Sequence, residues 1–174
     1  MTPDRDRVLL IGYGNPGRLD DGLGPALAEE IARRGLPGVT VEANYQLTVE
    51  DAAQVAEHDV VLFADADAAG PEPFSVRRVE PGPAEPGWSS HSVTPADVLG
   101  LASRLFAVRP PGWLLGIRGY EFDGFGEELS DRARANLDAA VAWTDNAIRE
   151  RRFGEVYPQQ TEEDLTCRNP NPSF

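Results

Sequence analysis

Five side chains in this sequence have the types and spacing to do chemistry together: four carboxylates and one imidazole. Asp20 and Asp21 follow the first apolar run of the chain, and Asp65 and Asp67 close the third. His91 follows a proline-rich loop. Carboxylate and imidazole donors both bind zinc or nickel-like ions, and three protein ligands leave an open position for water or substrate. The pattern indicates metal-assisted hydrolysis if the loops that carry these residues meet in one crevice.

Each of these residues also has an ordinary structural explanation. An aspartate at a helix N-terminus interacts favourably with the helix dipole, which would account for Asp20 or Asp21. Asp65 could cap a loop, and His91 could be an exposed loop histidine. The second histidine, His58, comes at the end of an expected helix, where we expect it to interact with the C-terminal dipole.

Other hydrolytic arrangements fit the sequence poorly. There is no G-x-S-x-G elbow, and the two histidines of the chain do not form an H-E-x-x-H zinc motif. Cys167, the single cysteine, lies in a polar tail with no activating group beside it. These observations disfavour serine and cysteine protease mechanisms.

Residues 12–17 read GYGNPG and match the G-x-G-x-x-G pattern of dinucleotide-binding loops. Glu42 ends the next expected strand, close to where a ribose-binding acid would lie. Two features oppose this interpretation. The residues after Gly17 delay the helix, and Asp20 and Asp21 place negative charge where phosphates would have to bind. An NAD(P)-binding Rossmann-type enzyme remains an alternative.

Short apolar runs alternate with amphipathic segments, which predicts an α/β fold with helices on both sides of a mostly parallel sheet, three layers in all. The carboxyl ends of parallel strands share one edge of the sheet, and this would bring the candidate residues together. The expected strands are 7–12, 39–42, 59–65, 74–79 and 113–117, and the strand 74–79 is the candidate for the sheet edge. The expected helices are 22–34, 48–57 and 94–106, and one that starts at Ser130.

Length and charge limit the classes of protein. The 174 residues fit one domain, which we place at 1–150, followed by a polar tail at 151–174 that we expect to be disordered. The formal net charge of −13 opposes nucleic-acid binding. The sequence shows no membrane span and no signal peptide, so we expect a cytoplasmic protein.

Three stretches, in order, are similar to one known family. Residues 9–31, LLIGYGNPGRLDDGLGPALAEEI, resemble the opening of the nickel-iron hydrogenase maturation endopeptidases: an apolar strand, G-x-G-N, a short loop, an acidic pair and a glycine-containing helix start. Residues 60–70, VVLFADADAAG, resemble the family's third strand with its terminal aspartate. Residues 89–102, SSHSVTPADVLGLA, resemble its histidine before an amphipathic helix, and 114–122 resemble its fifth strand and the following loop.

This resemblance implies a fold, a site and a function. The fold is a three-layer sandwich with a twisted five-stranded sheet between helices. The metal ligands and catalytic residues are Asp21, Asp65 and His91, and either aspartate is a candidate proton acceptor. The implied activity is removal of the C-terminal extension of a hydrogenase large-subunit precursor after nickel insertion, with the nickel carried by the precursor.

The resemblance also implies a partner, the large-subunit precursor. We expect it to contact the loop 120–128 and the turn 46–48 of a monomeric enzyme that binds no nucleic acid and no membrane. A non-catalytic maturation chaperone that binds the precursor is a further alternative.

Overall fold

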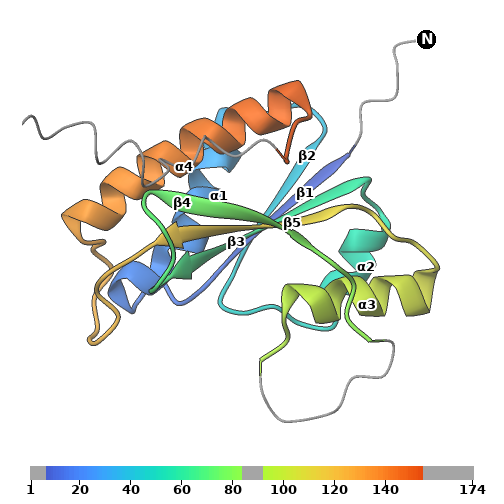
Figure 1. Cartoon of the computed structure of the whole chain (residues 1–174), viewed down its shortest axis with the longest axis horizontal. Coiled ribbons are helices and arrows are strands. Elements are labelled where there is room, and N and C mark those ends of the chain that lie inside the picture. Colours follow the sequence, from blue (N-terminus) through green and yellow to red (C-terminus); the bar gives the residue numbers. More distant parts are fainter. Residues whose placement is uncertain (1–6, 84–91, 155–174) are drawn as a thin grey trace, which may run out of the picture.

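The computed structural model describes residues 7–83 and 92–154, and it has a central sheet with helices on both faces (Figure 1). The strand order is β2-β1-β3-β5-β4, in which β4 pairs antiparallel with β5 and the other pairs are parallel. The predicted three-layer α/β fold with a mostly parallel five-stranded sheet is confirmed. The expected edge position of the strand at 74–79 is confirmed as well, because β4 is the last strand in the order.

The bounds of the elements follow the predicted ranges closely. The strands are β1 (Val8–Tyr13), β2 (Val39–Asn44), β3 (Val60–Asp67), β4 (Phe74–Val79) and β5 (Gly112–Arg118). A short 3-10 helix, η1 (Leu19–Gly22), precedes α1 (Leu23–Arg34), and the other helices are α2 (Asp51–Ala56), α3 (Pro95–Phe106) and α4 (Asp131–Glu150).

Two hydrophobic cores lie on the two faces of the sheet. Successive side chains of a strand point to opposite faces, so Leu10 of β1 joins the core under α1 and α4 while Ile11 joins the core under α2 and α3. The same alternation applies in β3, where Leu62 and Phe63 contribute to different cores. This is why β1 and the first half of β3 are apolar throughout, as strands covered on both faces must be.

Local signals position most helix ends. Thr94 and Asp97 form a capping box at the start of α3, with Pro95 as the first helical residue, and Ser130 caps α4. Gly35 ends α1 in the left-handed conformation. These predictions are confirmed.

Three predicted boundaries are wrong. The second strand does not end at Glu42 but continues to Asn44, because β1 pairs with it as far as the register partners Tyr13 and Asn44. The capping box expected at Thr48 does not form: α2 begins at Asp51, whose carboxylate accepts the Thr48 backbone N–H at 2.8 Å, and the Thr48 hydroxyl caps no helix N–H. The third strand does not end at Asp65 but continues to Asp67, because β5 pairs with it as far as the register partners Asp67 and Arg118.

Several predictions fall on residues outside the described ranges 7–83 and 92–154. These are His91, Cys167, part of the proline-rich loop at 84–91, and the tail from 155 to 174. In the part of the chain that the structure describes, no helix is long and apolar enough to cross a membrane.

Candidate active site

The loops after β1 and β3 leave the sheet at the place where parallel α/β proteins bind ligands. β1 and β3 are neighbours, yet the chain leaving β1 leads to β2 on one side, and the chain leaving β3 leads to β4 at the far edge. A crevice outside the carboxyl ends of two such strands is a topological switch point. Asp21 follows β1 and Asp65 belongs to β3, so the fold brings these two predicted residues to the same place.

Two glycines let the segment after β1 pack tightly over these strand ends. A Cβ on Gly24 would lie 2.3 Å from the carbonyl oxygen of Tyr13 and 2.5 Å from that of Ala64, so only glycine permits this approach of α1 to β1 and β3. Gly14 has a φ of 141°, and a Cβ there would lie 2.1 Å from the carbonyl oxygen of Asp21. These close approaches hold the segment that carries Asp21 against the ends of β1 and β3. This segment forms η1, and α1 begins after it.

Asp20 and Asp21 have different environments. Asp20 is fully buried, and its carboxylate accepts hydrogen bonds from the backbone N–H groups of Tyr120, Glu121 and Ser130 and from the Ser130 hydroxyl, at 2.8–2.9 Å. Burial raises the pKa of Asp20, but these hydrogen bonds outweigh it and hold the pKa below its ordinary value. Its lone pairs are occupied, so Asp20 has a structural role.

Asp21 is partly exposed and accepts one hydrogen bond from the described residues, from the backbone N–H of Asn15 at 2.9 Å. Asp65 is close enough for the charge of Asp21 to act on it. Burial raises the pKa of Asp65 to about 6, and the charges of Asp21 and Asp67 add to this effect although hydrogen bonds from Ala66 and Tyr13 oppose it. Two neighbouring carboxylates with free lone pairs can bind a cation or accept a proton.

Tyr13 is a site residue that the sequence analysis missed. It is the last residue of β1, and its hydroxyl lies close enough to the carboxylate of Asp65 for each group to shift the pKa of the other. Burial and the Asp65 charge raise the pKa of Tyr13 above its ordinary value, so Tyr13 stays neutral beside Asp65. Tyr13 and Asp65 point to the same face of the sheet, like Ile11 and Phe63. Strand alternation after an assigned pairing could have identified this contact.

Of the three predicted metal ligands, the structure describes two. The two predicted ligands Asp21 and Asp65 lie together, and the third, His91, is outside the described residues. Within the ranges 7–83 and 92–154, no group of three or more His, Cys, Asp or Glu side chains is gathered as a metal site would require. His58 is engaged elsewhere, since its ring nitrogens lie 2.6 Å from the Gln54 carbonyl oxygen of α2 and 2.7 Å from the Thr40 hydroxyl.

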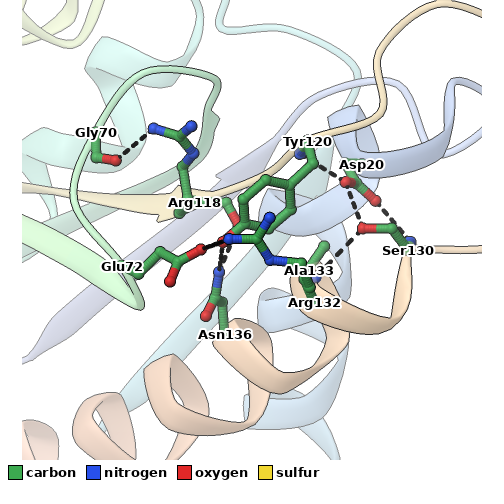
Figure 2. A network of polar contacts seen from close by, with 9 residues as sticks. All are labelled: Asp20, Gly70, Glu72, Arg118, Tyr120, Ser130, Arg132, Ala133 and Asn136. Atoms are coloured by element: carbon green, nitrogen blue, oxygen red, sulfur yellow. Dashed lines mark hydrogen bonds and ion pairs between the residues drawn. The ribbon is translucent and has the colours of Figure 1, made fainter.

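A polar cluster connects the end of β5 to the start of α4 (Figure 2). The Tyr120 hydroxyl donates to Glu72 and accepts from the Asn136 side chain at 2.9 Å. The Arg132 guanidinium lies 4.0 Å from the centre of the Tyr120 ring and pairs with Glu72, while Arg118 lies 5.3 Å from the same ring. The cluster fixes the base of the loop 119–130, beside the Asp20 hydrogen bonds.

This three-layer α/β arrangement is similar to the fold of solved hydrogenase maturation proteases. No protein-family model matches the sequence, and no curated protein sequence does. Solved structures do match, and the fold that the sequence resemblance implied is confirmed by them.

Three of these structures illustrate the likeness. The [NiFe] hydrogenase maturation protease HycI from Thermococcus kodakarensis KOD1 has a TM-score of 0.63 and 20% identity, over 84% of this chain and 95% of its own. The hydrogenase 2 maturation peptidase from Thaumarchaeota archaeon SCGC_AB-539-E09 has a TM-score of 0.60 and 24% identity, over 82% and 97%. The hydrogenase maturating endopeptidase HybD from E. coli has a TM-score of 0.59 and 22% identity, over 83% and 93%.

Proposed function

We propose that this chain is an endopeptidase of hydrogenase maturation, which removes the C-terminal extension of a [NiFe] hydrogenase large-subunit precursor after nickel insertion. The observation that carries the proposal is the likeness to the HycI, hydrogenase 2 and HybD proteases over more than four fifths of the chain. The placement of Asp21 and Asp65 at one switch point supports it, because the resemblance implies both as ligands.

The residues divide the work as follows. The nickel belongs to the substrate, because the precursor carries it. Asp21, Asp65 and His91 bind this nickel. The donor set fits a nickel-like ion, since carboxylate and imidazole ligands both bind such ions. Asp20 takes no part in binding because its lone pairs are occupied by Tyr120, Glu121 and Ser130.

The chemistry is the hydrolysis of one peptide bond by water. A carboxylate with a free lone pair accepts the proton of the attacking water, and Asp21 or Asp65 can do this because neither is saturated by the described donors. The Tyr13 hydroxyl lies beside Asp65 and stays neutral, so it adds no competing charge. The nickel, when present in the substrate, polarises the scissile carbonyl or the water.

The test is incubation of the protein with nickel-loaded and nickel-free precursor, followed by mass spectrometry of the precursor C-terminus. We expect mass loss with the nickel-loaded form alone, and its abolition in Asp21→Asn and Asp65→Asn. The exposed Asp138→Asn on α4 is the matched control and should cleave normally.

Three other results would contradict parts of the proposal. Cleavage without nickel would overturn nickel-dependent recognition and leave the protease. Binding of the precursor by the purified wild type without cleavage, together with normal processing in cells that carry Asp21→Asn or His91→Ala, would favour the binding chaperone. No cleavage, with NAD retained on the purified protein, would favour the dinucleotide-binding alternative.

A further inference from the structure

Phe125 lies in the middle of the loop 119–130, which joins β5 to α4, and the residue is 95% exposed. It is the most exposed of the large apolar side chains in the part of the chain that the structure describes. A single exposed apolar residue is common on protein surfaces and would need no explanation on a mobile loop. The contacts of this particular loop make the exposure informative.

The loop is held in place at both ends and in the middle. Asp20 accepts hydrogen bonds from Tyr120 at one end and Ser130 at the other, and Figure 2 shows both contacts. In the middle, the Leu19 N–H donates to the Gly126 carbonyl oxygen at 2.8 Å, and the Gly126 N–H donates to the Gly17 carbonyl oxygen at 2.9 Å. Phe125 is therefore presented by an ordered backbone, and a ligand that binds it loses little loop entropy.

The same segment positions the candidate catalytic carboxylate. The residues that hold the loop are Gly17, Leu19 and Asp20, and Asp21 follows directly in the chain. A polypeptide bound along the loop would therefore contact the segment that leads into Asp21.

The surface around Phe125 is acidic. The loop carries four exposed carboxylates that form no ion pair with the described residues: Glu121, Asp123, Glu127 and Glu128. Two arginines also contact the loop, Arg18 at the Phe122 carbonyl oxygen and Arg134 at the Leu129 carbonyl oxygen, so the negative charges outnumber the positive ones by two. The whole chain has a net charge of −13, so an acidic partner is repelled from this face and a basic one is attracted.

We propose that the loop 119–130 is a docking surface for a basic polypeptide segment that carries an apolar side chain, with Phe125 contacting that side chain. This inference rests on the proposed function, in which the segment belongs to the protein substrate and lies beside the peptide bond to be cut. The apolar contact supplies affinity, and the four carboxylates select lysine or arginine around it.

The test uses a short synthetic peptide in which lysines flank a leucine, followed by two-dimensional NMR of the full chain. We expect shift changes concentrated at residues 119–130 and 17–19. Matched peptides with glutamate for lysine, or serine for leucine, should bind more weakly. Phe125→Ser should lower the affinity for the lysine peptide about tenfold. Leu105→Ser, which replaces an exposed residue at the C-terminal end of α3, should leave the affinity unchanged.

The charge of the loop is tested separately. Replacing its four carboxylates by amides should weaken binding of the lysine peptide and reduce the dependence of affinity on salt. Unchanged affinity in Phe125→Ser, equal binding of the glutamate peptide, or shift changes confined to another face would each overturn the inference.

Failure of the proposed function has a different signature. Wild-type protein that binds the peptide at this loop but cleaves no precursor would refute the peptidase and leave the docking surface. Normal precursor cleavage with unchanged peptide affinity in Phe125→Ser would refute the docking surface and leave the peptidase.

Discussion

Asp20 and Ser130 are 110 positions apart in the sequence, and the carboxylate of Asp20 accepts both the backbone N–H and the hydroxyl of Ser130 at 2.8 Å. Ser130 is also the N-cap of α4, where its hydroxyl oxygen accepts the Ala133 N–H. One buried carboxylate therefore connects the segment after β1 to the start of the last helix. This contact holds the β5–α4 loop next to the candidate site.

Asp20→Asn should lower the free energy of unfolding by about 3 kcal/mol or more. An amide has one acceptor oxygen, so some N–H donors of residues 120–130 lose their partner, and each buried group left unpaired costs about 1–3 kcal/mol. Urea unfolding followed by circular dichroism measures this change. Asp138→Asn, exposed on α4, should change stability by less than about 0.5 kcal/mol. A similar small effect for Asp20→Asn would show that the buried contacts are dispensable.

The Asp20 contribution should also depend on pH. Its folded-state pKa lies below the unfolded value of about 3.9, so the native protein binds fewer protons than the unfolded chain in that range. The contribution is complete above about pH 4 and is lost as the pH falls through the lower folded pKa. The stability difference between wild type and Asp20→Asn should therefore shrink below about pH 4, and a constant difference would contradict this assignment.

Asp65→Asn should have the opposite effect on stability. The folded-state pKa of about 6 lies above the unfolded value, so the ionised carboxylate destabilises the fold as the pH rises from about 4 to about 6. After allowance for partial exposure, the substitution should raise stability at about pH 7.5 by about 1–2 kcal/mol, and by almost nothing near about pH 4. Thermal unfolding in the presence of a chelator measures this gain, and precursor cleavage should be lost in the same variant.

Asp67→Asn is the matched control for Asp65. One oxygen of the Asp67 carboxylate accepts the backbone N–H groups of Ala69 and Gly70 at 2.9 and 2.8 Å, and the amide oxygen of asparagine can accept the same two bonds, so this substitution should change stability by less than about 1 kcal/mol. A gain in stability for both variants would indicate a general relief of negative charge in place of a specific effect at Asp65.

Gly24→Ala should disrupt the junction of α1 with β1 and β3. The added Cβ would meet the carbonyl oxygens of Tyr13 and Ala64 at 2.3 and 2.5 Å, and backbone atoms inside a sheet cannot move aside cheaply. We expect a loss of about 3 kcal/mol or more, or no folded protein. Gly35→Ala meets no atom within 4 Å, and it should cost about 1–2 kcal/mol from its left-handed conformation alone. Equal losses in the two variants would contradict the close-packing argument.

Tyr120→Phe tests the hydroxyl at the base of the loop. It removes the bonds to Glu72 and Asn136 but keeps the ring beneath Arg132, so we expect a loss of about 1 kcal/mol. Tyr120→Leu also removes the cation–π contacts and should cost more. Hydrogen exchange of the amides of 119–130 should accelerate in both variants, and most in Tyr120→Leu. Unchanged exchange would show that Asp20 alone holds the loop.

Local patterns predicted the elements of this fold. Strand burial and helix capping are local, so a few neighbouring residues were enough to predict them. Examples are the apolar run at 60–63, the threonine and proline at the start of α3, and the glycine after α1. The expected capping box at Thr48 was wrong although its pattern matched, because the segment forms a turn there and the helix begins at Asp51. The third strand is longer than predicted because its end depends on pairing with β5.

The sequence by itself determined the strand and helix order, and it identified Asp21 and Asp65 as candidates. Only the tertiary structure decided that Asp20 is a buried structural anchor, that Tyr13 lies beside Asp65, and that Phe125 is exposed on the loop that Asp20 holds. Asp20 and Asp21 are the same residue type at adjacent positions, so no local pattern distinguishes them. Their roles differ because hydrogen-bond donors from residues 120–130 reach one carboxylate and not the other, and such contacts exist only once the chain has folded.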